Sequence, residues 1–345
     1  MDIKRPQLDE AVRRGLLSDN QATQLWAFLS EQGQNTPSFR MTHILYYLGG
    51  MIAIGAMTLF MTLGWESFGG GGLLVISLLY AAAGLALTEH LLKARHLPIP
   101  AGITATFVVV LTPLAVYGLQ VMMGWWADGR VYRDYHVFVD WRWLLMELAT
   151  LAAAALMLWR YRLAFLVMPV AVTLWYMSMD LVPYLFGYDQ VDWAARKFVS
   201  LWFGLLMTLL AFWVDVRTRH ETQDFPFWLY LFGVLTFWGA LSSMNSDSEW
   251  SKLGYCALNL LMIGIGAVLS RRVFAVFGGL GVTAYLGHLA ATVFKDSLMY
   301  PFALTAIGLG VVYLGIVWQR HEAGITAQLR AALPKVLGEM LDNRA

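Results

Sequence analysis

Three ionisable side chains lie inside apolar stretches, where a charge is costly, and these residues are the ones that could do chemistry. Glu147 and Asp180 each lie about six residues from the end of such a stretch, and His288 lies at a similar depth in a third. Six helical residues span roughly 9 Å, so all three could share one layer of a membrane. Neighbouring carboxylates repel and histidine titrates near neutrality, so this group could bind a proton, a cation or a basic solute.

Two amide side chains extend this candidate site. Gln120 lies in the same layer, and Asn259 lies at or just below it. The candidate substrate- or proton-binding residues are therefore Glu147, Asp180, His288, Gln120 and Asn259. The alternative is that they only hold helices together or reach the surface near Arg142 or Lys295, because membrane helices commonly associate through polar side chains.

Other chemistry is less well supported by the residue pattern. Glu147, Asp180 and His288 could form a metal-binding set, but no HExxH spacing or Cys/His cluster accompanies them. His43 and His90 share one face and would suit a lipid-modifying enzyme, yet no serine, cysteine or oxyanion motif stands beside them. We expect no catalytic residue, no metal, no cofactor and no nucleic-acid binding.

The elements that must position these residues follow from hydropathy. Of the 345 residues, 59% are hydrophobic and only 14% are charged, whereas about 25% are charged in a soluble domain. The apolar residues come in blocks of about twenty, the length of a helix that crosses a hydrocarbon core about 30 Å thick. Backbone groups in lipid must bond within their own segment. The sequence therefore predicts an all-α polytopic integral membrane protein.

Ten membrane-spanning helices are predicted, and they divide the chain into three parts. Residues 1–40 form a helical hairpin and linker, residues 41–319 the ten-helix transmembrane domain, and residues 320–345 an amphipathic tail. In the hairpin, Gly15 ends the first helix, and Ser18 and Gln21 form a capping box that opens the second. The spans are expected at about 42–63, 72–92, 99–124, 142–160, 163–186, 197–215, 226–243, 253–270, 273–294 and 301–319.

Basic residues indicate which ends of these spans face the cytoplasm. Short loops at alternate ends each carry a basic pair, which places them inside, because cytoplasmic loops are enriched in lysine and arginine. The opposite loops collect acidic residues such as Asp128, Asp189 and Glu249. Both termini and the N-terminal hairpin are therefore expected in the cytoplasm. The basic pairs are Lys93/Arg95, Arg160/Arg162, Arg217/Arg219 and Arg271/Arg272.

The first 60 or so residues carry a family resemblance. Leu8, the run Gly15-Leu16-Leu17-Ser18 and the pair Gln21-Ala22 precede a polar linker and a glycine-bearing first span, YYLGGMIAIGAM. This arrangement resembles domain-of-unknown-function family 2157, a bacterial family of predicted membrane proteins. The resemblance implies a multi-pass protein of the bacterial inner membrane. It implies no activity and no catalytic residues.

Three functions remain open from the sequence. The first is a non-enzymatic, transporter-like protein for a small solute, cation or proton, with an outward-facing polar pocket at the candidate site. The second is a structural or sensory membrane protein that recruits a cytoplasmic partner through its hairpin, or self-associates. The third is a lipid-modifying membrane enzyme. The lipid bilayer is the partner that all three share.

Overall fold

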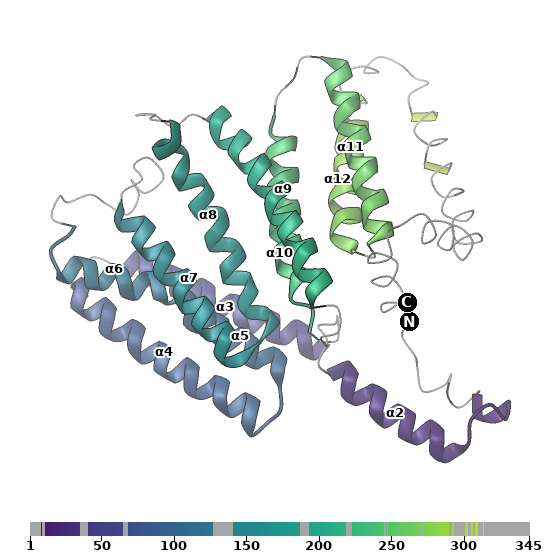
Figure 1. Cartoon of the computed structure of the whole chain (residues 1–345), viewed down its shortest axis with the longest axis horizontal. Helices are drawn as coiled ribbons and strands as arrows, with labels where there is room; N and C mark the ends of the chain where they lie inside the picture. Colours follow the sequence, from purple (N-terminus) through teal and green to yellow (C-terminus); the bar gives the residue numbers. More distant parts are fainter. Residues whose placement is uncertain are drawn as a thin grey trace. The chain divides into compact units, whose positions relative to one another are not determined.

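The computed structural model is helical throughout the part of the chain that it describes (Figure 1). The described residues are 8, 11–34, 41–64, 68–126, 141–186, 193–218, 223–244, 246, 248–269, 271–289, 292, 301–302, 305, 308–309 and 313. The helices are α2 (Asp19–Gln34), α3 (Met41–Gly64), α4 (Gly69–Lys93), α5 (Pro98–Val110), α6 (Thr112–Met122), α7 (Trp141–Tyr161), the 3₁₀ turn η2 (Ala164–Leu166), α8 (Val167–Phe186), α9 (Trp193–Arg217), α10 (Pro226–Ser242), α11 (Glu249–Val268) and α12 (Arg272–His288).

Five of the described segments are long and apolar enough to cross a membrane, by length and composition. They are Gly69–Lys93, Pro98–Met122, Trp141–Tyr161, Trp193–Arg217 and Glu249–Val268. Shorter apolar helices occur at Ile44–Met57, Ala164–Asp180 and Pro226–Ser242. Large hydrophobic side chains remain exposed along these helices, for example Leu79, Leu156 and Leu206, as expected where lipid replaces water around a protein. The described part of the chain is therefore all-helical, and its apolar helices indicate multi-pass membrane character.

Nine of the ten predicted spans fall on described helices, counting α5 and α6 as the third span. The tenth span, at 301–319, lies largely outside the described residues, and the tail at 320–345 lies wholly outside them, as does the loop at 127–140. The prediction differs from the structure mainly in the third span. Its helix is interrupted at Leu111, two residues before Pro113, because proline lacks the N–H group that would continue the hydrogen-bond ladder.

The chain divides into two compact units, described separately. Unit 1 comprises residues 1–196 and 221–232, and unit 2 comprises residues 197–220 and 233–345. In unit 1, α5 and α6 lie in the middle: α5 contacts α3, α4 and α7, while α6 contacts α4 and α7. A core of small and aliphatic side chains joins α5 to α7 and η2, and it includes Ala101, Ala105, Ala154 and Leu166.

Close helix contacts in both units depend on glycine. A Cβ atom on Gly118 of α6 would lie 2.7 Å from the carbonyl oxygen of Gly70 on α4. In unit 2, a Cβ on Gly204 of α9 would lie 2.8 Å from the carbonyl oxygen of Gly233 on α10. Membrane helices approach this closely when small residues line their interface, so these four glycines set the spacing of both helix pairs.

One end of unit 1 carries Lys93, Arg95, Arg160 and Arg162, and we call it the basic end. There, Glu89 accepts hydrogen bonds from Tyr161 Oη at 2.9 Å and Arg160 Nη2 at 3.1 Å, and it also pairs with Lys93. The two turns at this end are tight. Arg162, between α7 and η2, has φ of 48°, and His96, between α4 and α5, has φ of 51°.

The N-terminal hairpin has the predicted capping box. The backbone N–H of Ser18 donates to Gln21 Oε1 at 3.0 Å, and the N–H of Gln21 donates to Ser18 Oγ at 3.2 Å. Gly15 has φ of 71° where the first helical turn ends, also as predicted. Leu8 and Ala22 are buried, whereas Leu16 is exposed. The hairpin thus has a small core of its own and an exposed apolar side chain at its turn.

Candidate functional site

Glu147 is a buried carboxyl group in unit 1. It lies six residues into α7, roughly 9 Å from the start of the helix, on the face that also buries Met146, Thr150 and Ala154. Its side chain is 7% exposed. Its carboxyl oxygens make no hydrogen bond of normal geometry among the described residues, and the group that interacts with them is the carboxyl of Asp180. Buried polar atoms in native proteins nearly always have a partner, so this group needs an explanation.

Asp180 is the acidic neighbour of Glu147. It lies six residues before the end of α8 and is half-buried. Helices α7 and α8 pack side by side after the tight turn at Arg162 (Figure 1), and the Asp180 carboxyl interacts electrostatically with that of Glu147. The structure therefore brings together two of the predicted site residues. Their ability to bind a substrate or proton stays a prediction.

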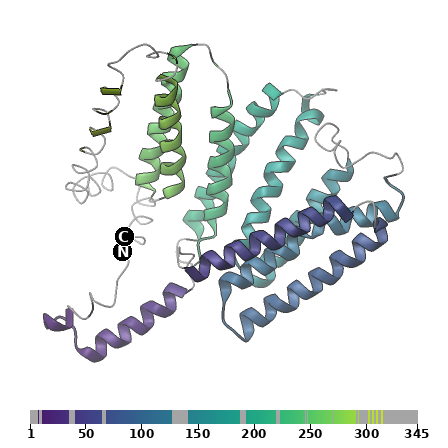
Figure 2. The same cartoon turned by 180° about the vertical axis from the view of Figure 1, so that it is seen from behind.

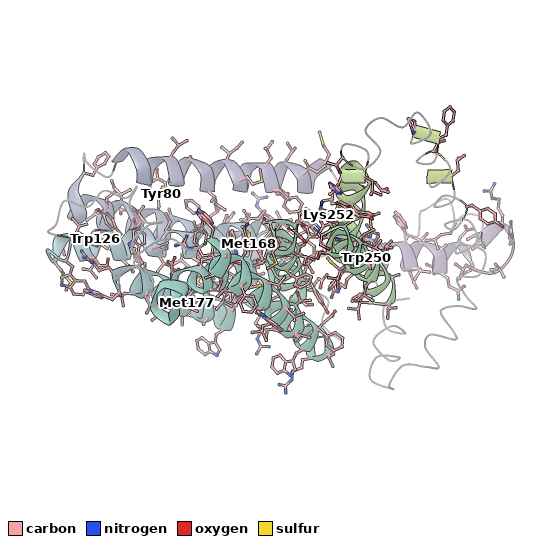
Figure 3. The ribbon with its side chains drawn as sticks, turned by 90° about the horizontal axis from the view of Figure 1, so that it is seen from above. Tyr80, Trp126, Met168, Met177, Trp250 and Lys252 are labelled. Carbon is pink, nitrogen blue, oxygen red and sulfur yellow. The ribbon has the colours of Figure 1, made fainter. Side chains whose placement is uncertain are left out.

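Both polar atoms of the Gln120 side chain make hydrogen bonds that hold neighbouring segments together. Its Nε2 donates to the carbonyl oxygen of Arg142 at 3.0 Å, and its Oε1 accepts from the indole N–H of Trp126 at 2.9 Å. Trp126, labelled in Figure 3, also stacks edge-on with Trp143 and lies under the Arg142 guanidinium at 4.9 Å. Both ends of the amide are thus used in joining α6, the turn after it, and the start of α7.

Asn259 has the corresponding role in unit 2. Its Oδ1 accepts a 3.1 Å hydrogen bond from the indole N–H of Trp238 on α10, and its Nδ2 donates to the carbonyl oxygen of Tyr255 at 2.8 Å. Its amide also packs directly against Gly281 of α12, where a Cβ would overlap it. Asn259 therefore links α10, α11 and α12, as a polar side chain does when it joins membrane helices.

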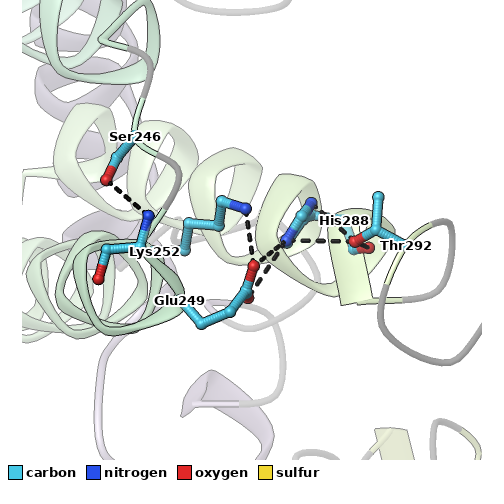
Figure 4. A network of polar contacts seen from close by, with 6 residues as sticks. Ser246, Glu249, Lys252, His288 and Thr292 are labelled. Carbon is cyan, nitrogen blue, oxygen red and sulfur yellow. Dashed lines mark hydrogen bonds and ion pairs between the residues drawn. The ribbon is translucent and has the colours of Figure 1, made fainter.

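His288 lies in unit 2, beside the start of α11. It is the last residue of α12, and its Nε2 lies 3.4 Å from both carboxylate oxygens of Glu249, the first residue of α11 (Figure 4). Glu249 also pairs with Lys252 at 2.7 Å. His288 follows Gly281 by seven residues, roughly 10 Å along α12, and Gly281 is the residue that packs on Asn259. His288 and Asn259 are therefore in different layers.

The five candidate residues fall into two groups. Gln120, Glu147 and Asp180 belong to unit 1, and Asn259 and His288 belong to unit 2. Of the five candidates, Glu147 alone is buried with side-chain oxygens that make no hydrogen bond of normal geometry among the described residues, and its carboxyl interacts with that of Asp180. In that part of the chain no three His, Cys, Asp or Glu side chains are grouped to hold a metal ion. The pair is the centre of the candidate site.

The sequence reasoning missed one buried ion pair. Arg271, interpreted only as a topology signal, donates from Nη2 to Asp215 Oδ1 at 2.8 Å and from Nε to Oδ2 at 3.1 Å. The sequence did contain a sign of this pair. Asp215 is an acidic residue two positions before the end of the apolar helix α9, and a charge in such a helix usually has a partner. Of the two histidines considered for lipid chemistry, His90 is exposed, and the side chain of His43 lies outside the described residues.

No family model, curated protein or solved structure matches this chain. The resemblance to domain-of-unknown-function family 2157 therefore stays a prediction.

Proposed function

We propose that the chain crosses the bacterial inner membrane ten times and that both termini are cytoplasmic. The nine predicted spans that coincide with described helices support this, as do the basic turns at Arg162 and Arg271. Fusions of a reporter that is active only in the external compartment test it. The reporter should be silent after Arg162 and Arg272 and active after Trp126. Activity after either arginine would contradict the proposed orientation.

We further propose a transporter-like function in which Glu147 and Asp180 bind a proton or a small cation. Glu147 carries the proposal, because its buried carboxyl oxygens interact with another carboxyl group, that of Asp180, rather than with a hydrogen-bond donor of the described part of the chain. A side chain used only for packing would have partners, as Gln120 and Asn259 do. A buried carboxyl kept against another carboxyl weakens the fold, so we attribute it to a functional requirement.

Asp180 supports the same assignment. A second carboxyl group near a buried one raises the repulsion between them when both are charged. A bound proton or cation would relieve that repulsion, and its release would restore it. The pair could therefore alternate between an occupied and an empty state, which is the property that a transport site needs.

Proton movement is the direct test. Purified protein is reconstituted in liposomes that contain a pH-sensitive dye, and a potassium diffusion potential is applied. We expect dye responses from the wild type and a loss of response in Glu147→Gln and Asp180→Asn. Glu89→Gln is the matched control, because Glu89 is a half-buried carboxyl with three bonded neighbours. If both site variants respond like the wild type, with protons and with sodium or potassium gradients, the proposal fails.

The hairpin supports recruitment of a cytoplasmic partner as a second candidate function. It folds with its own cap, yet Leu16 is 74% exposed and Leu25 is 36% exposed. Exposed leucines on a small helical hairpin form a surface of the kind that partner helices cover. A photoreactive residue at Leu25 should cross-link to a discrete protein in cells. Adducts to lipid or to the chain itself alone would contradict recruitment.

A further inference from the structure

A groove runs along unit 1 between α3, α4 and α5. Its volume is about 420 Å³. It exists because α3 and α4 both pack on α5: a Cβ on Gly50 of α3 would lie 2.5 Å from Ile103 Cγ2, and one on Gly84 of α4 would lie 2.7 Å from Val108 Cγ2. Figure 2 shows α3 and α4 running alongside each other over this part of the unit. The small residues that line the groove are Gly49, Gly50, Ala53, Ala83 and Gly84.

The lining offers almost nothing to a polar ligand. Apart from the rings of Tyr46 and Tyr80, which is labelled in Figure 3, it consists of aliphatic, phenylalanine, proline and glycine groups and one threonine. The hydroxyl of that threonine, Thr104, is engaged with Thr88 at 2.8 Å and with the carbonyl oxygen of Ala101 at 3.0 Å. The groove therefore selects a hydrocarbon group.

The groove is long enough to hold part of an extended acyl chain. On α3 the lining extends from Leu45 to Ala53, which is roughly 12 Å of helix. An extended acyl chain is thin enough to enter, and a volume of this size is within the usual range for small-ligand sites.

Charge identifies the lipid. The groove extends from the middle of α4, at Tyr80, toward the basic end, where Leu87 and Pro100 line it. The connection between α4 and α5 follows directly and carries exposed Lys93 and Arg95. Glu89 pairs with Lys93 and Arg160, so this end keeps a net positive charge that would attract a phosphate.

We propose that this groove is a binding site for an anionic phospholipid. One acyl chain lies between α3 and α4 on the floor formed by α5, and the phosphate lies near Arg95. The site does not depend on Glu147 or Asp180, and it would hold a lipid whether or not the protein transports an ion.

Photolabelling tests the proposal. The full chain is placed in phosphatidylcholine nanodiscs with a trace of phosphatidylglycerol that bears a diazirine in one acyl chain, and labelled peptides are mapped. We expect adducts to concentrate on residues around Tyr80 and Leu87, and unlabelled phosphatidylglycerol to compete better than phosphatidylcholine. Adducts spread evenly over lipid-facing residues such as Leu156 and Leu206 would overturn the site.

Variants of α3 provide a matched pair. A Cβ at Gly49, in the groove, or at Gly55, outside the lining, would meet no atom within 4 Å. Gly49→Phe should therefore fill the groove without displacing a helix and lower labelling by about fivefold or more, because buried methylene groups hold the chain. Gly55→Phe should leave labelling unchanged. Equal labelling of both variants would contradict the proposal.

The headgroup and the lipid source are tested separately. Lys93→Gln combined with Arg95→Gln should lower labelling by the phosphatidylglycerol probe but not by a phosphatidylcholine probe with the same chain. Equal effects on the two probes would overturn the choice of an anionic lipid. A diazirine fatty acid that labels the groove when the phospholipid probe does not would show that the ligand is a free fatty acid, contrary to the proposal.

Discussion

Asp215 and Arg271 form a two-point ion pair inside unit 2, between the end of α9 and the residue that caps the start of α12. The side chains are 1% and 8% exposed. Mutual attraction in such a place must offset the loss of hydration of both groups. The pair therefore fixes where the turn between α11 and α12 meets α9.

Removing one member of this pair should strongly destabilise the protein. Asp215→Asn or Arg271→Gln leaves the other member poorly compensated in a buried position, which costs about 3–5 kcal/mol. Thermal unfolding in detergent should show a large drop in midpoint for each single variant. The double variant Asp215→Leu/Arg271→Met should lose much less, since it leaves no buried charge. Equal losses in single and double variants would contradict this account.

Glu147 should behave in the opposite way. Because the Asp180 carboxyl is the group that interacts with its buried oxygens among the described residues, Glu147→Leu removes a buried polar group together with the repulsion between two carboxyls. We expect the unfolding midpoint to rise by a few degrees while ion movement in liposomes disappears. A fall in the midpoint would show that Glu147 is held by partners and would support a packing role.

Asn259→Ala should weaken unit 2 without touching the Glu147–Asp180 pair. The substitution deprives the Trp238 indole N–H of its acceptor, and it leaves a space beside Gly281. Interhelical hydrogen bonds of this kind contribute about 0.6–1.7 kcal/mol in membranes. The thermal unfolding midpoint should fall moderately, and the fluorescence of Trp238 should change. Ion movement should be retained at temperatures where the variant is folded. Loss of ion movement in a folded variant would contradict this account and would indicate that Asn259 takes part in ion binding.

Gly118→Ala should separate α4 from α6. The new methyl group would lie 2.7 Å from the backbone of Gly70 and 2.8 Å from that of Leu74, and backbone atoms cannot turn aside as a side chain can. Overpacking of this kind costs about 1–3 kcal/mol or more. Gly264→Ala is the control, because its Cβ would meet no atom within 4 Å. Comparable midpoints for the two variants would show that the close approach is unimportant.

The sequence predicted the helices well because each span is a long apolar run with its own ends. It also placed Glu147 and Asp180 at a similar depth, and the short turn at Arg162 then brings their helices, α7 and α8, together. Both inferences depend on residues close in the chain or on one repeated property, hydropathy. Helix positions and contacts between consecutive helices can be predicted without knowing how helices far apart in the sequence pack.

The remaining contacts depend on helices that meet far apart in the sequence. Nothing near Gln120 shows that the turn after α6 brings Trp126 back onto it. The partner of Arg271 is 56 residues away, and a basic residue at a turn already has a sufficient explanation as a topology signal. Gln120 and Asn259 were grouped with the carboxyls because depth can be counted along a helix. The direction in which each side chain points cannot be counted in this way.

The left-handed backbone at Arg162 has a consequence for how the protein enters the membrane. Glycine would adopt this conformation freely, whereas another residue gives up about 1–2 kcal/mol. Compared with glycine, arginine at this turn therefore lowers the stability of the folded protein but places a positive charge midway along the chain. In the proposed orientation, that charge would keep the turn between α7 and α8 on the cytoplasmic side while the two helices insert. Arg162→Gly should raise the thermal stability of the folded protein. It should also increase the fraction of the protein that inserts in the inverted orientation.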